Sequence, residues 1–216
     1  MADYCLPFVL EKNKGGCDHG AKCSLRSFLP RDLQDVCQRN PFLSEYLHSI
    51  PLKNIGVPTY YPQLPRDLAN LEMPNVIYPI DNGLFVHIFP DRGARDYYVS
   101  IEPDLTLDLD ELTQQVEAKL LDYAERVGVA ETEEERRQAL LDVVDDLCTT
   151  APSSLSGKIL VTPRELEGLK YRLLRDKIGL GILQPLLADP YIEDISCSGT
   201  GSIFIEAIFR VPGLGK

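Results

Sequence analysis

The sequence predicts an α+β fold, because three kinds of hydrophobic pattern follow one another along the chain. Short apolar runs bounded by turn residues fill residues 76–101, apolar positions at steps of three or four fill residues 109–174, and two further strand-like runs lie between residues 191 and 205. A stretch of weak periodicity precedes them all. We therefore expect an N-terminal loop-rich and helical segment, an antiparallel β-meander, a helical layer and a small β-hairpin.

The N-terminal part, residues 1–60, is expected to be a cysteine-containing segment of loops and short helices. Pro30 to Cys37 and Pro41 to His48 are predicted helices, since proline suits the first helical turn, where its missing N–H would have no partner. Residues 52–74 hold four prolines and indicate a linker. A second region, residues 75–216, is expected to form an α+β module.

The meander is predicted from three runs, Val76–Ile80, Leu84–Phe89 and Tyr97–Ile101, with a turn at Asp91–Gly93 before the last. Asn82 and Gly83 between the first two runs are the strongest local signal for a hairpin, because both residue types accept a positive φ. Pro79 cannot donate a hydrogen bond to a β-ladder, so the first strand is predicted to lie at an edge of the sheet.

Three amphipathic helices are predicted after the meander, each with one apolar stripe; the first stripe runs from Leu109 to Val127. Each predicted start has the spacing of a capping box. The pairs are Asp108 with Glu111, Thr132 with Glu135, and Thr162 with Glu165. Gly179 and Gly181 are expected to end the third helix, because glycine commonly follows a helix C-terminus.

The charge of the chain is acidic, with 22 Lys and Arg against 33 Asp and Glu and a net charge of −11. Most of the excess lies between residues 99 and 149, and such a face would repel nucleic acid. It is interpreted as a solvated helical surface or as a docking face for a basic partner. No apolar run is long enough for a transmembrane helix and the start has no signal-peptide pattern, so a cytoplasmic protein is expected.

The most specific motif is GLGILQPLLADPYIEDISCSG, residues 179–199. It resembles the N-terminal region of the type II and type IV secretion ATPases, the hexameric motors of protein secretion, pili and archaella. Tyr98, Val99 and the segment EPDLT, residues 102–106, resemble the archaeal branch of that family. The resemblance implies an assembly or regulatory module. Its expected partners are a motor domain, neighbouring subunits and a membrane platform protein, at the inner face of the membrane.

The sequence lacks the phosphate-binding loop of such motors, which needs a glycine five residues before a Gly-Lys-Ser/Thr run. Gly215 and Lys216 are similar, but Arg210 stands where that glycine would be, and no Ser or Thr follows. ATP is therefore expected to bind only to a motor domain that this sequence does not contain. The chain alone is predicted to be catalytically silent.

Two carboxylates in the motif, Glu193 and Asp194, have two interpretations. A catalytic acid pair is disfavoured, because adjacent residues of a strand point to opposite faces. A structural role is favoured, in which they accept backbone hydrogen bonds at a helix–strand corner. The flanking Ile192 and Ile195 are expected to be buried.

The remaining candidate site consists of cysteines near the N-terminus. The candidate ligands are Cys5, Cys17, Cys23 and Cys37, with His19 as a spare. Zinc or an iron–sulfur cluster would stabilise a segment without a core, which gives a second hypothesis: an independent metal- or iron–sulfur-binding interaction protein. Because no Cys-x-x-Cys pair is present, free thiols are the alternative. Cys148 and Cys197 are predicted to pack as small apolar residues, and no role is assigned to His48 or His87.

Overall fold

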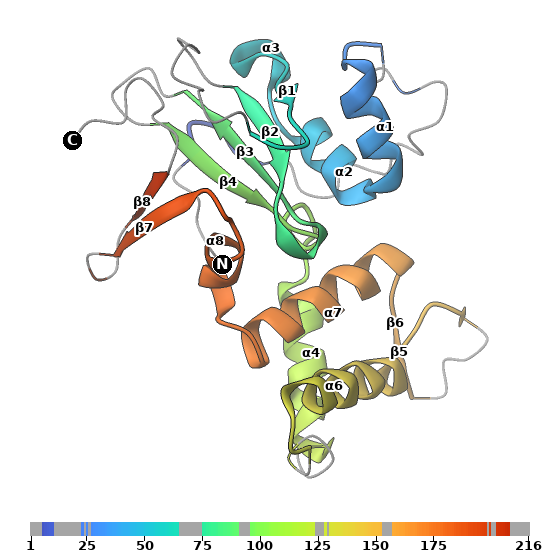
Figure 1. The fold of residues 1–216 in the computed structure, drawn as a ribbon. Coiled ribbons are helices and arrows are strands. Elements are labelled where there is room, and N and C mark those ends of the chain that lie inside the picture. Colours follow the sequence, from blue (N-terminus) through green and yellow to red (C-terminus); the bar gives the residue numbers. More distant parts are fainter. Residues whose placement is uncertain are drawn as a thin grey trace. The chain divides into compact units, whose positions relative to one another are not determined.

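The computed structural model describes residues 6–10, 23, 25, 27–64, 75–90, 96–123, 128, 130–152, 157–197, 199 and 202–207 (Figure 1). By its internal contacts the chain divides into two compact units. Unit 1 comprises Met1–Thr106 and Pro185–Lys216, and unit 2 comprises Leu107–Gln184. Unit 1 is therefore built from both ends of the chain. The α+β class that the sequence predicts is confirmed.

Three helices open unit 1: α1 (Arg31–Arg39), α2 (Pro41–Ser49) and α3 (Leu52–Ile55). The first two correspond to the predicted helices. Pro30 is the N-cap residue of α1, one position before the helix, whereas Pro41 is the first residue of α2. In both places the proline needs no intrahelical donor. The third helix lies in the stretch predicted as a linker.

The sheet of unit 1 has the order β1-β2-β3-β4, with strands β1 (Thr59–Tyr60), β2 (Val76–Pro79), β3 (Phe85–Phe89) and β4 (Tyr97–Ile101). Antiparallel pairing of β2 with β3 and of β3 with β4 confirms the meander. The prediction that Pro79 places its strand at the edge is wrong, because β1 pairs with β2 in parallel. This pairing involves only Val76 and Ile77, so the missing N–H of Pro79 costs the sheet nothing.

The predicted hairpin turn closes as the 3-10 turn η1 (Asp81–Gly83), with the backbone N–H of Ile80 donating to the carbonyl of Leu84 at 2.9 Å. Gly83 has a φ of 73°, a conformation that costs glycine little and other residues more. The turn predicted at Asp91–Gly93 lies outside the described residues.

Alternate residues of the strands face opposite sides of the sheet, and both sides are covered. One face packs against α1 and α2 (Figure 1); its buried residues are Ile77, Phe85, Phe89, Val99 and Ile101. Leu33, Leu43 and Leu47 of the two helices are at most 1% exposed in this core. The other face carries Tyr78 and Tyr98, which contact the C-terminal part of unit 1.

Unit 2 is mainly helical. Its longer elements are α4 (Asp110–Leu120), α6 (Glu133–Leu147) and α7 (Pro163–Lys177); the shorter ones are η2 (Leu121–Tyr123), β5 (Cys148–Thr149), β6 (Ile159–Leu160) and η4 (Gly181–Leu183). The parallel pair of β5 and β6 is not anticipated by the sequence, since two residues are too few to show a period. Val116, Val144 and Leu169 are completely buried where the helices meet. Val127, at the end of the first predicted stripe, lies outside the described residues.

Two of the three predicted capping boxes are confirmed. Thr132 and Thr162 each accept a hydrogen bond from the backbone of the glutamate three residues on, and that glutamate binds back to the cap. The box predicted from Asp108 is wrong, because Leu109 is the N-cap residue of α4 and no side chain caps it. The helix therefore begins one residue later than the Asp108–Glu111 spacing requires.

Part of the acidic excess is paired within unit 2. Lys170 of α7 contacts Asp145 of α6 at 2.6 Å, and Arg172 contacts Asp110 of α4 at 2.9 Å. These pairs are partly exposed, so each contributes little to stability. They favour the interpretation of the acidic stretch as a solvated helical surface.

The segment that follows α7 requires glycine at position 179. A Cβ atom built there would lie 2.9 Å from the backbone carbonyl oxygen of Arg175 and 2.9 Å from Oε1 of Gln184. The same Gln184 oxygen accepts a hydrogen bond from the backbone N–H of Leu180. Gly179 thus lets the chain turn tightly after α7, as the predicted helix end implies.

The C-terminal part of unit 1 contains α8 (Gln184–Leu187), which begins at the boundary between the units, and a hairpin of β7 (Ile192–Cys197) and β8 (Ile203–Ala207). The small predicted hairpin is confirmed. Ile192 and Ile195 are only half-buried, so their predicted full burial is wrong. The reason is that no residue of β7 or β8 is fully covered, although Ile195 pairs with Ile205.

This half-burial predicts a small effect of truncation. Ile195→Ala is expected to lower the free energy of unfolding by about 1 kcal/mol, below the usual range for a core isoleucine. Ile101→Ala, at a residue with no exposed surface, is the matched control and should cost about 2–5 kcal/mol. Urea unfolding of both variants measures the difference, and equal losses would show that the hairpin is packed as tightly as the sheet.

Within the described parts of the chain, no helix combines the length and the hydrophobicity needed to cross a membrane.

Candidate functional site

The segment that resembles the secretion ATPases turns around one buried carboxylate, Asp189. Its side chain is 5% exposed. One oxygen, Oδ2, accepts hydrogen bonds from the hydroxyls of Tyr78 at 2.7 Å and Tyr98 at 2.9 Å. The other, Oδ1, accepts the backbone N–H of Tyr191 at 2.9 Å. Asp189 therefore joins the corner between α8 and β7 to two strands of the meander.

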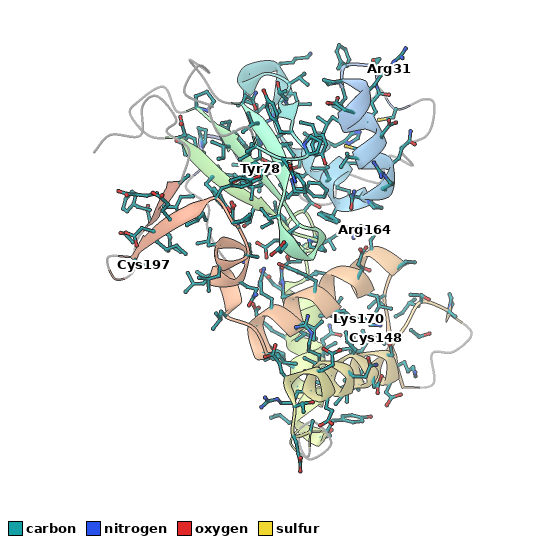
Figure 2. All side chains as sticks on the ribbon, in the orientation of Figure 1. Arg31, Tyr78, Cys148, Arg164, Lys170 and Cys197 are labelled. Atoms are coloured by element: carbon teal, nitrogen blue, oxygen red, sulfur yellow. The ribbon has the colours of Figure 1, made fainter. Side chains whose placement is uncertain are left out.

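Tyr78 is almost fully buried in this contact and lies in the middle of the sheet (Figure 2). Its burial, and then the neighbouring Tyr98 and Asp189, raise the pKa of the phenol above its ordinary value. The hydroxyl is therefore a permanent donor. Tyr191 packs edge-on against Tyr78, with ring centroids 5.5 Å apart, and its own hydroxyl accepts the backbone N–H of Leu64.

The carboxylates predicted to hold this corner, Glu193 and Asp194, do not do so. Both are exposed. The described contact of Asp194 is with the hydroxyl of Ser196, at 3.4 Å. A carboxylate does hold the corner, as predicted, but it belongs to Asp189 and not to Glu193 or Asp194. Asp189 takes the role because it precedes Pro190, where the chain leaves the helix and its carboxylate can reach both the backbone and the sheet.

The shorter motif, residues 102–106, is also built into the interior of unit 1. Glu102 is 5% exposed and accepts a hydrogen bond from the hydroxyl of Ser100 at 3.0 Å. Thr106 is equally buried and donates to Oε2 of Glu45 on α2 at 3.1 Å. Both segments that carry the resemblance thus place polar side chains in internal contacts.

A second buried polar chain runs through His87, to which the sequence assigns no role. Nδ1 of His87 accepts the hydroxyl hydrogen of Tyr46 at 2.7 Å, and Nε2 lies 2.8 Å from Oδ1 of Asn75. Nδ2 of Asn75 donates to the carbonyl of Ile55, so Oδ1 faces the histidine and Nε2 carries the proton. Burial lowers the pKa of His87 to about 3, and the imidazole is neutral. No local sequence pattern joins these residues, because the partners come from separate elements.

Three of the candidate metal ligands lie outside the described residues: Cys5, Cys17 and the spare His19. Cys23 is half-buried and Cys37 buried, and the two line one small cleft. Among the residues that the structure describes, no three His, Cys, Asp or Glu side chains come close enough to hold a metal ion. The metal hypothesis therefore stays a prediction.

The two remaining cysteines differ from each other. Cys148 is buried among the apolar residues of unit 2, as predicted, and its burial raises the pKa of the thiol. Cys197 is exposed, so its predicted packing is wrong. It is the last residue of β7 and lies near the tip of the hairpin (Figure 2).

No protein-family model matches the chain. A protein of Methanocaldococcus jannaschii, named uncharacterized protein MJ0900, is 31% identical over an alignment of 182 residues that covers 78% of this chain and 33% of the relative. The chain thus spans about one third of the relative that it matches.

Proposed function

We propose that this chain is the N-terminal assembly and regulatory module of a secretion, pilus or archaellum motor ATPase. The long motif at residues 179–199 and the shorter one at residues 102–106 support this proposal. The archaeal relative agrees with it in one respect, because two thirds of its length lie outside the shared region and leave room for a motor domain.

The observation that carries the proposal is that buried polar residues of the two motifs make hydrogen bonds inside unit 1. Asp189 has both carboxylate oxygens in internal hydrogen bonds, and Glu102 and Thr106 are likewise buried with partners. Groups that serve substrate chemistry need access to the substrate, whereas these groups hold segments together. The motif is therefore better suited to shaping a surface than to performing a reaction.

Three of the exposed side chains of the same motif are large and apolar. Leu180, Ile182 and Leu187 are 62%, 53% and 56% exposed, within eight residues of sequence. Leucine and isoleucine at such positions gain free energy when a partner covers them. In the proposed function they contact a motor domain or a neighbouring subunit.

The test mixes the chain with a separately produced motor domain of a secretion ATPase from the same organism. The chain alone should hydrolyse no ATP above buffer background. Added to the motor domain, it should form a complex by size-exclusion chromatography and change the ATPase rate. Leu187→Asp should abolish both effects, because a charge in a covered apolar contact is costly to bury.

Val57→Asp is the matched control, since Val57 is an exposed apolar residue outside the motif, at 38% exposure. It should leave binding and the ATPase rate unchanged. A chain that neither binds nor alters any such motor domain, while remaining folded, would contradict the proposed function. ATP turnover that survives further purification of the chain alone would contradict its non-catalytic part.

A further inference from the structure

Cys23 and His48 form a close thiol–imidazole pair in unit 1. The sulfur of Cys23 lies 3.2 Å from Nε2 of His48, and both side chains are half-buried. The two residues are 25 positions apart, so the fold and not the local sequence brings them together. A thiol within hydrogen-bond reach of an imidazole is the arrangement that makes a cysteine nucleophilic.

The backbone of α2 fixes the orientation of His48. Nδ1 donates to the carbonyl oxygen of Ser44, four residues earlier in the helix, at 2.7 Å. Since a carbonyl can only accept, Nδ1 carries a proton and the neutral ring presents a lone pair at Nε2 toward Cys23. The lone pair of Nε2 is therefore oriented to accept the thiol proton of Cys23.

A second thiol, Cys37 of α1, lines the same cleft as Cys23, together with Leu25, Leu29 and Gln34. Cys37 is 7% exposed and is therefore shielded from solvent. The two thiols are thus unequal. Cys23 has a base at 3.2 Å, whereas Cys37 is buried.

We propose that Cys23 is a hydroperoxide-reactive thiol, with His48 as its base and Cys37 as the resolving thiol. This inference does not depend on the proposed function. The Cys23 proton passes to Nε2 of His48, and the thiolate sulfur attacks one oxygen of the hydroperoxide. The O–O bond breaks, the second oxygen takes the proton from His48 and leaves as water or an alcohol, and Cys23 becomes a sulfenic acid.

The disulfide forms in the second step. The sulfur of Cys37 attacks the sulfur of Cys23, the S–O bond breaks, and the hydroxyl leaves as water with the proton of Cys37. With hydrogen peroxide, two thiols lose two electrons in total and the peroxide becomes two molecules of water. The product links the segment before α1 to the last turn of that helix, beside the core of unit 1.

Peptide mapping of the full chain tests the proposal. The reduced protein is treated with hydrogen peroxide, quenched with catalase, alkylated and digested with trypsin without reductant. Cys23 lies in the tryptic peptide CSLR and Cys37 in DLQDVCQR, so a disulfide between them gives one linked species. We expect this species to appear first, before oxidation of the exposed Cys197. Cys37→Ser should let dimedone trap a sulfenic acid on Cys23.

The role of His48 has its own readout. His48→Gln keeps a polar side chain but removes the base, and it should slow the alkylation of Cys23 by iodoacetamide about tenfold or more. The rate at Cys197 in the same sample is the internal control and should not change. Oxidation of Cys23 no faster than Cys197 in the wild-type protein would overturn the proposal without any variant. So would tightly bound zinc or iron that blocks alkylation of Cys23 until a chelator is added, because the thiol would then be a metal ligand.

Discussion

Asp189→Ala is expected to lower the free energy of unfolding of unit 1 by about 3 kcal/mol. The carboxylate accepts three hydrogen bonds, two from tyrosine hydroxyls and one from the backbone of Tyr191. Its removal leaves these donors without an acceptor in a place where Tyr78 is only 1% exposed. A buried donor without a partner costs more than the hydrogen bond itself contributes. Chemical denaturation followed by circular dichroism measures the change.

Asp194→Ala is the matched control, because it removes an exposed carboxylate from the same motif. It should change stability by no more than about 0.5 kcal/mol. Combining Asp189→Ala with Tyr98→Phe measures the interaction free energy between these two side chains, apart from the effect of each substitution alone. The double variant should lose less than the sum of the two single losses. Equal effects of Asp189→Ala and Asp194→Ala would show that the corner does not depend on Asp189.

The elements of this fold were predictable where a local rule decides them. Two Thr-x-x-Glu capping boxes fix the starts of α6 and α7, and Asn82-Gly83 fixes the first hairpin. Rules that depend on distant neighbours failed. Pro79 did not mark an edge, because a two-residue strand from another part of the chain pairs beside it. The half-burial of Ile195 is a second case, because the burial of a strand residue depends on whether a distant segment packs over its strand.

The site was less predictable for the same reason. The sequence places Asp189 in a motif, but only the fold shows that its partners are on β2 and β4, 111 and 91 residues away. His48 and His87 had no local signal at all. Each histidine meets a partner from a different element, Cys23 in one case and Tyr46 with Asn75 in the other. Rules based on sequence spacing find partners that share one helix or strand, whereas the partners of Asp189, His48 and His87 come from separate parts of the chain.

The stability of the protein is expected to fall as the pH drops below 6.5, in part because of His87. Its pKa is about 3 in the folded protein against an ordinary value of 6.5, since the ring is completely buried. Above pH 6.5 the side chain is neutral in both states and contributes no pH dependence. Between pH 6.5 and 3 the unfolded chain binds a proton that the folded protein does not, so protonation favours unfolding.

The expected loss from His87 alone is about 2 kcal/mol on going from pH 7.5 to pH 5, because the slope approaches about 1.4 kcal/mol per pH unit. His87→Gln is the variant that tests this, since an amide can still bond to Tyr46 and Asn75 but does not titrate. The variant should be less stable than the wild type at pH 7.5 and should lose about 2 kcal/mol less on acidification. Urea unfolding at several pH values measures both slopes. Parallel slopes for the two proteins would mean that the imidazole accepts a proton without unfolding, and that the chain from Tyr46 through His87 to Asn75 tolerates a charge.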